Sequence, residues 1–349
     1  GIRYERAVPQ SVVCMPSRST MLTGQHQATH GVWMNGVPLP VAAPSVATLL
    51  HREGYRTALI GKAHFEPFLD PLGRFTENQL SGLGVPTVSA PQYDGLPGPH
   101  RGFEHLQFAT HGATGWLHYA QWLGANHPES VRDYYQVLDG DLEVNAEGFG
   151  DTGAPQVKHN AIPKDWYHTD WVAERTIEWL DGLDEQDDWF CWMSFPDPHH
   201  PWDPPASEVD RVDWRDLDLP AGHPGSEEAV RTVLARKPPH WLGYWEGTFA
   251  NREGGPAAFV PGRLTHDQIR EVRHSDLLGP LRALLHRRVA QAMESLHPGD
   301  VGRHALALGT HYREAGDWDK AVTHLRQAGL IAASRYAGRE AGGCFEQAL

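Results

Sequence analysis

Residues 45–64, SVATLLHREGYRTALIGKAH, predict a short helix followed by a short strand. Ser45 is a favoured helix N-cap and Gly54 a favoured helix terminator, so a helix is expected between them. The apolar run from Arg56 to Ile60 predicts a buried strand, which leads directly into GKAH at residues 61–64. This stretch therefore indicates a helix that packs beside the strand it precedes.

The same order of elements occurs a second time. Residues 170–183 carry apolar side chains at helical spacing, and Trp189 to Phe195 forms an apolar run that ends at PDPHH, residues 196–200. Repeated helix–strand units predict an α/β fold whose sheet is covered by helices. Ligands of such sheets bind beyond the carboxyl ends of the strands, which makes Lys62, His64 and His199 candidate site residues.

Two long segments interrupt this pattern. Residues 66–160 and 205–265 are rich in Gly, Pro and polar residues. We expect them to leave the sheet as long excursions that shape access to a substrate.

The composition changes near Val272. The net charge is −16 before this point and +2 after it, and 12 of the 13 Trp precede it. Such a change predicts a boundary between two domains, residues 1–272 and residues 273–349.

The second part is predicted to be all-α, with helices over 281–296 and 302–349. Its spaced aromatic, apolar and small residues include Leu308, Gly309, Tyr312, Gly316, Trp318, Ala321, Leu325 and Ala328. This pattern resembles one tetratricopeptide-type helix pair, and the segment is similar to the helical region of multidomain ATP-binding regulators. Repeats of this type bury their apolar faces against neighbours, so we expect a protein partner to bind through the tail.

The overall balance of residues limits the class of partner and the location. The net charge of −14 argues against a nucleic-acid partner, because phosphate binding needs a basic surface. No apolar run is long enough to span a membrane, and no signal peptide is seen. Because the chain begins at Gly1 we expect a segment before it, and we take the cytoplasm as a working location.

Three cysteines at wide spacing form no disulfide framework.

Residues 14–24, CMPSRSTMLTG, give the strongest functional signal. We expect Pro16 to prevent a helix from starting before it, Ser17 to be the N-cap, and Arg18 to Leu22 to open the helix. A side chain at that end lies near unpaired backbone N–H groups, which favour an anion. The stretch resembles C-x-P-S-R-x-x-x-L-T-G, the signature of the formylglycine-dependent sulfatases of the alkaline phosphatase superfamily.

The resemblance implies a fold, a cofactor and a reaction. The fold is the sulfatase-like mixed sheet covered by helices, here incomplete and followed by the helical tail. A formylglycine-generating enzyme would oxidise Cys14 to formylglycine, whose hydrated aldehyde attacks the sulfur of a small-molecule sulfate ester. Arg18 would hold the hydrate.

Two further elements extend the resemblance. The family's G-K-x-H element matches residues 61–64, so Lys62 would hold a sulfate oxygen and His64 would contact the hydrate. Its P-H-x-P element matches residues 198–201, so His199 would contact the ester and protonate the leaving alcohol. His200 is the weaker candidate for substrate binding, at the rim.

Metal ligands are the missing part of the resemblance. The family holds calcium through oxygen ligands, among them two adjacent aspartates upstream of the cysteine and a D-[HN]-G element. Neither occurs in this sequence, so we assign no metal ligand and expect impaired or absent turnover. Two other interpretations stay open: a phosphonate or phosphate monoester hydrolase of the same superfamily, and a non-catalytic chimera with a protein-binding tail.

Overall fold

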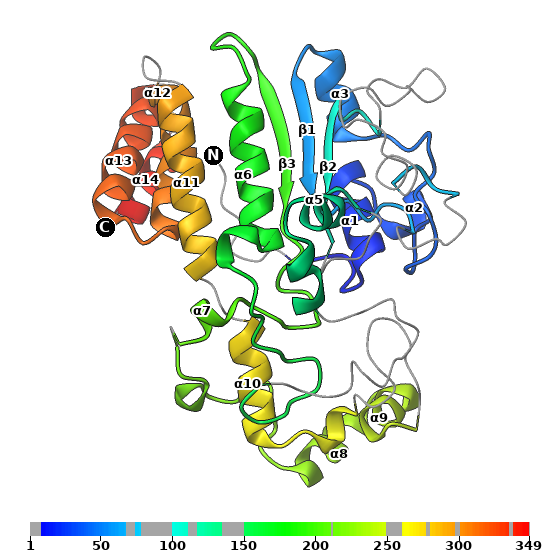
Figure 1. The fold of residues 1–349 in the computed structure, drawn as a ribbon. Helices are drawn as coiled ribbons and strands as arrows, with labels where there is room; N and C mark the ends of the chain where they lie inside the picture. Colours follow the sequence, from blue (N-terminus) through cyan, green and yellow to red (C-terminus); the bar gives the residue numbers. More distant parts are fainter. Residues whose placement is uncertain are drawn as a thin grey trace.

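A computed structural model describes residues 8–67, 74–77, 100–110, 117–134, 150–210, 212–248, 260–276, 280–296, 301–334 and 338–348 (Figure 1). Its centre is a parallel sheet of three strands in the order β2-β1-β3. The strands are β1 (Arg56–Gly61), β2 (His105–Phe108) and β3 (Trp189–Ser194). The α/β fold predicted from the sequence is confirmed.

The register of the sheet brings the ends of all three strands together. Gly61, the last residue of β1, pairs with Phe108 of β2 and with Ser194 of β3. Because the strands are parallel, the segments that follow them leave from one edge of the sheet. This edge collects the chain after residue 61 and after residue 194, as the sequence predicts.

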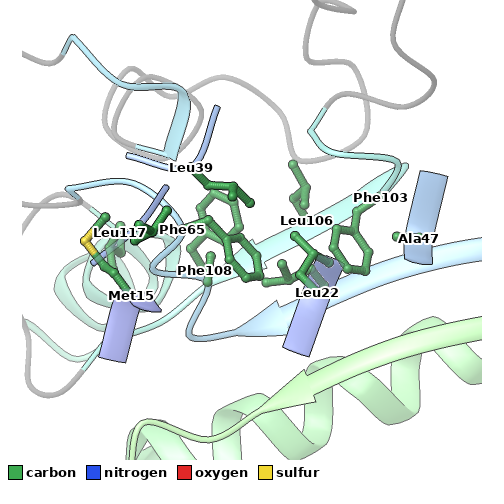
Figure 2. Packing of buried hydrophobic residues seen from close by; sticks show 12 residues of the cluster. Met15, Leu22, Leu39, Ala47, Phe65, Phe103, Leu106, Phe108 and Leu117 are labelled. Carbon is green, nitrogen blue, oxygen red and sulfur yellow. The ribbon is translucent and has the colours of Figure 1, made fainter. Parts of the chain in front are cut away.

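Helices cover both faces of the sheet (Figure 1). Alternate side chains of β1 point to opposite faces, so Leu59 lies in one apolar cluster while Ala58 and Ile60 lie in another. The first cluster includes residues of α1 (Cys14–Thr23) and α3 (Val46–Arg52) (Figure 2). The second includes residues of α5 (His118–Asn126) and α6 (His168–Asp181).

The local predictions around the two helix–strand units are confirmed. The Ser45 hydroxyl caps α3 by accepting a hydrogen bond from the Ala47 N–H at 3.2 Å. Both predicted strands and the predicted helix over 170–183 are present, with ends displaced by one or two residues. Strand β2 was not predicted, because its four residues HLQF lie inside a segment dominated by Gly and Pro.

The predicted start of the helix after Cys14 is wrong. Helix α1 begins at Cys14 itself, Val13 is its N-cap, and the Ser17 N–H bonds to the Val13 carbonyl at 3.1 Å. Pro16 is tolerated because the N–H groups of the first helical turn have no partner within the helix. Cys14 is therefore the first residue of the helix rather than a loop residue before it.

The long excursions are partly described. Residues 68–73, 78–99, 111–116 and 135–149 of the first excursion lie outside the described residues. The described parts of the second, residues 205–210, 212–248 and 260–265, lie in a lobe below the sheet in Figure 1. The remaining elements of these regions are α2 (Gln27–His30), α7 (Ala206–Val209), α8 (Glu227–Leu234), α9 (Pro239–Glu246), α10 (His266–Asp276) and four short 3₁₀ helices (Pro128–Asp133, Lys164–Trp166, Trp214–Asp216 and Pro261–Arg263).

The tail is helical, as predicted, and lies against the sheet domain. Helix α11 packs along α6, and Met193 of β3 packs against the apolar cluster of the tail (Figure 1). Helix α10 runs across Val272, where the composition changes, so the domain boundary stays a prediction. The tail helices are α11 (Pro280–Leu296), α12 (Val301–Glu314), α13 (Trp318–Ser334) and α14 (Gly338–Ala348). No helix in the described part of the chain is long and apolar enough to cross a membrane.

Asp170 on α6 is a buried carboxyl at the contact between the tail and the sheet domain. Its side chain is 0% exposed, its oxygens accept no hydrogen bond within the described residues, and Arg288 of α11 lies 3.8 Å away. Burial raises the pKa of Asp170 from 3.8 to about 6, against the opposing charges of Lys164 and Arg288. The folded state thus binds the proton more tightly, and stability falls as pH rises from about 4 to about 6.

We therefore expect Asp170→Asn to raise the free energy of unfolding at pH 7.5, by up to roughly 3 kcal/mol. The gain should fade towards pH 4, where the wild-type carboxyl is protonated. Urea unfolding at the two pH values measures it. Asp181→Asn, at an exposed position of the same helix, is the control. Equal pH dependence of wild type and Asp170→Asn would contradict the prediction.

Candidate active site

Cys14 lies half-buried at the amino-terminal end of α1. The turn before it is fixed by the Ser11 hydroxyl, which accepts a hydrogen bond from the Val13 N–H at 3.1 Å. The Met15 N–H donates to Asn35 Oδ1 at 3.0 Å. The side chain at position 14 therefore stands at the positive end of a ten-residue helix, which favours an anion there.

Arg18 joins α1 to the ends of two strands. Its guanidinium donates to the carbonyl oxygens of Lys62 and Ala63 and to Ser194 Oγ, the last at 2.7 Å. It also lies 5.7 Å from the ring centre of Trp192. Burial lowers the pKa of Arg18 to about 10, so the side chain is still a cation at neutral pH.

Lys62 brings a second buried cation to Cys14. Its side chain leaves the end of β1, and Nζ lies 3.8 Å from Cys14 Sγ. The residue is only 7% exposed, and its backbone N–H donates to the Ser194 carbonyl at 2.8 Å. Burial lowers the pKa of Lys62, while the neighbouring Cys14 acts in the opposite direction.

His64 lies beside Lys62 in an unusual backbone conformation. Its φ of 59° is in the left-handed region, and its N–H donates to Glu77 Oε2 at 2.9 Å. Burial, followed by the positive charges of Lys62, Arg18 and His199, holds the pKa of His64 well below its ordinary value. The imidazole is therefore neutral at physiological pH. A small pocket at this point is lined by Lys62, His64, Glu77, Phe108, Thr110 and Leu117, among others.

The two histidines after β3 face different partners. His199 Nδ1 donates to the His200 carbonyl at 2.5 Å, and the two rings stack with their centres 4.4 Å apart. His200 Nδ1 lies 3.2 Å from Gln156 Oε1, in the first excursion. His199 is close enough to His64 for its charge to act on that residue's pKa.

The loop that carries these histidines is anchored on α6. Asp197 accepts hydrogen bonds from His168 Nε2 at 3.1 Å, from Tyr167 at 3.3 Å and from the Thr169 hydroxyl. The start of α6 thus holds the loop that carries His199.

The structure brings the predicted residues Cys14, Arg18, Lys62, His64 and His199 to one edge of the sheet, with His200 one residue further out. Sequence reasoning missed Ser194 and Glu77, which contact Arg18 and the backbone of His64. Ser194 could have been found as the polar residue near the end of the strand predicted from Trp189 to Phe195, and it is the last residue of β3. Glu77 had no such signal, because it lies in an excursion without a recognisable pattern.

The described residues form no calcium site at Cys14. Two groups of three side chains could hold a metal ion, Glu66 with Glu77 and His100, and Asp151 with His159 and Glu271. Neither includes Cys14 or another of the predicted site residues. No group of three carboxylate, histidine or cysteine side chains that could bind an ion such as calcium therefore lies at Cys14 among the described residues.

The fold is that of an alkaline-phosphatase-like α/β protein. One solved structure with the same fold is the phosphonate monoester hydrolase of Agrobacterium radiobacter, with a TM-score of 0.50 and 21% identity. The match covers 82% of this chain and 51% of that chain. The family model named Sulfatase matches residues 1–216, and the chain belongs to this family.

Curated relatives cover the same region. The arylsulfatase of Clostridium perfringens is 26% identical over 227 residues, which are 63% of this chain and 40% of that protein. The multifunctional alkaline phosphatase superfamily protein PehA of Trinickia caryophylli is 25% identical over 280 residues, 78% of this chain and 48% of its own length. The chain thus spans less than half the length of these relatives.

Proposed function

We propose that this chain is a sulfuric ester hydrolase whose reacting group is a formylglycine formed from Cys14. The observation that carries the proposal is the 3.8 Å contact between Lys62 Nζ and Cys14 Sγ at the start of α1. A buried cation and a helix N-terminus that meet at one side chain suit a sulfate group. Family membership supports the class of reaction.

Formylglycine supplies a hydroxyl nucleophile for sulfur once it is formed and hydrated. The residues of this chain would bind and orient the ester around it. Lys62 is assigned to a sulfate oxygen, because its ammonium already lies at the reacting position. His64 is assigned to the hydroxyl groups at position 14, where a neutral imidazole can accept or donate a hydrogen bond.

Arg18 is proposed to act mainly as a fixed cation. Its three contacts with Lys62, Ala63 and Ser194 commit much of the guanidinium to the protein. They hold Lys62 and position 14 in one geometry, so the positive charge is in place before an anion arrives. Direct contact with the hydrate would use its remaining N–H groups.

His199 is proposed to protonate the leaving alcohol, and His200 to contact the substrate at the rim. The hydrogen bond from His199 Nδ1 to the His200 carbonyl fixes the ring orientation, as proton transfer requires. His200 lies against Gln156, so substrate selection at this side would involve the first excursion.

The tail is proposed to be a tetratricopeptide-type unit, residues 273–349, that binds a protein partner. Helices α12 and α13 pack so closely that a Cβ on Gly309 would lie 2.7 Å from Leu325 Cγ. Close approach at a small residue is consistent with the helix pair predicted from the sequence.

The experiment is co-expression of the full chain with a formylglycine-generating enzyme. Peptide mass spectrometry then shows whether the thiol of Cys14 is replaced by an aldehyde. The same sample is assayed with matched aryl sulfate, aryl phosphate and phosphonate monoester substrates, with and without added calcium.

We expect conversion of Cys14 and a preference for the sulfate ester, with slow turnover because the described residues around Cys14 hold no group of acidic side chains for calcium. Preference for the phosphonate or phosphate would assign the chain to the alternative hydrolase class. Conversion without turnover of any of these esters would contradict the proposed activity of this chain.

A further inference from the structure

We infer that Glu77 is a positioning residue of this site, which holds the backbone of His64 and Phe65 so that His64 lines the same pocket as Lys62. The role of Glu77 in catalysis rests on the proposed function. The dependence of the His64 conformation on Glu77 does not, and it can be measured without turnover.

The contact is two-pronged. Glu77 Oε2 accepts a hydrogen bond from the His64 N–H and Oε1 accepts one from the Phe65 N–H, both at 2.9 Å. The carboxylate thus binds two consecutive backbone groups, directly after the two residues whose carbonyl oxygens accept from Arg18. Arg18 and Glu77 therefore hold adjacent parts of one short segment, residues 62–65.

His64 needs such support because of its backbone. A left-handed conformation costs a residue with a Cβ roughly 1 kcal/mol or more, and it persists only where the surroundings hold it. Phe65 anchors the other end of the segment, since it is fully buried and its ring meets Trp192 edge-on at 5.6 Å. Glu77 fixes the N–H groups between these anchors.

Glu77 is itself held in place by a chain of contacts through Glu66 and Arg101. Its N–H donates to Glu66 Oε2 at 3.1 Å, and Glu66 is paired with Arg101 at 3.0 Å. Arg101 in turn donates to the carbonyl oxygens of Leu39 and Pro40. This chain of contacts ties the segment at His64 to the loop before α3.

Glu77 belongs to the site itself, because its side chain lines the pocket there. Glu77 lines the same pocket as Lys62 and His64, although it is only 1% exposed. Burial raises the pKa of this carboxyl to about 7, and its charge acts on Arg18. A buried acid is costly next to a site for anions, and the hydrogen bonds that Glu77 accepts from the His64 and Phe65 N–H groups offset part of that cost.

The chain contains a matched control. Glu271 is 0% exposed and accepts hydrogen bonds from two consecutive N–H groups, those of Asp151 and Thr152. It lies on α10, in the lobe below the sheet (Figure 1). Substituting it removes an equivalent buried carboxylate from a place away from His64.

The test is NMR titration of the histidine rings in the full chain with an unmodified Cys14, with His64 assigned from His64→Gln. We compare Glu77→Ala, Glu77→Gln and Glu271→Gln with the wild type. Because burial raises the pKa of Glu77 to about 7, its carboxyl is already largely protonated where His64 titrates, so loss of its charge alone would leave the pKa of His64 unchanged. Loss of positioning exposes the ring to water and raises the pKa towards its ordinary value.

We expect the pKa of His64 to rise by about one or more in Glu77→Ala. Glu77→Gln should be intermediate, because its amide keeps one acceptor oxygen, and Glu271→Gln should match the wild type. An unchanged or lower pKa of His64 in Glu77→Ala overturns the inference. If Glu77→Ala does not fold, Glu77→Gln decides: a wild-type titration curve overturns the inference, and a shift upward supports it.

Turnover separates this inference from the proposed function. In formylglycine-bearing protein we expect Glu77→Ala to lower kcat about 10- to 100-fold, while Glu271→Gln keeps it. A wild type without turnover but with the expected shifts of His64 would contradict the sulfatase proposal and leave the positioning role standing. Wild-type kcat in Glu77→Ala would overturn the positioning role in catalysis.

Discussion

The Cys14→Ala variant is expected to lose sulfate ester turnover by at least about 10⁴-fold when compared with formylglycine-bearing protein. Alanine cannot be oxidised to an aldehyde, so no nucleophile stands at the start of α1. Lys62 and the helix N-terminus are still present and should continue to bind a sulfate group. The loss should therefore fall on kcat rather than on KM, measured by steady-state kinetics with an aryl sulfate.

The other two cysteines provide the controls. Burial raises the pKa of Cys191 to about 12, and Cys344 is buried in an apolar cluster of the tail, so both are unreactive at neutral pH. Cys344→Ala and Cys191→Ala should keep turnover within a few-fold of the wild type. Persistence of turnover in Cys14→Ala would show that another group reacts and would overturn the assignment of Cys14.

Sequence reasoning succeeded where a feature depends on neighbouring residues. The cap at Ser45, strand β1 and the order of α6 and β3 follow from local patterns, and the structure has all of them. The parallel arrangement then places the ends of β1 and β3 at one edge. That is why Lys62 and His199 could be assigned to one site from positions 137 residues apart in the chain.

Sequence reasoning failed where tertiary contacts decide. Strand β2 has only four residues and is a strand because it pairs with β1, which no local pattern reveals. Helix α1 starts at Cys14 although Ser17 is the better N-cap by residue type, because Pro16 fits the first turn. Glu77 reaches His64 across twelve intervening residues, six of which lie outside the described part of the chain.

The contact of the tail with the sheet domain is another feature that tertiary contacts decide and that local sequence patterns do not reveal. The change of composition near Val272 predicts two separate units, yet Met193 of the sheet packs on the tail cluster and Arg288 lies by Asp170. A partner that binds the tail would therefore contact helices that also pack against α6. Because the first turn of α6 holds Asp197, the tail is connected through one helix to the loop of His199.

The second large effect is expected for Gly61→Ala, which should lower the free energy of unfolding by about 3 kcal/mol or more. Gly61 has a φ of 104°, which a residue with a Cβ rarely adopts. A Cβ there would lie 1.8 Å from the Ser194 carbonyl oxygen, which accepts a hydrogen bond from the Lys62 N–H. One methyl group would thus push apart the ends of β1 and β3.

Gly54→Ala isolates the effect of this close approach. Gly54 also has a positive φ, 90°, but a Cβ there would meet no atom within 4 Å. We expect its cost to be only the backbone strain, about 1 kcal/mol. Urea unfolding of both variants measures the difference, and equal losses would contradict the argument from the Ser194 contact.

Gly61→Ala should also disturb the geometry of the site in those molecules that remain folded. Ser194 contributes both the carbonyl that meets Gly61 and the hydroxyl that accepts from Arg18 at 2.7 Å. A displaced Ser194 would release Arg18, and with it the contact that holds Lys62 beside position 14. The glycine that opens the G-K-x-H element is thus required by the approach of two strands, and the geometry of the two cations at Cys14 depends on that approach.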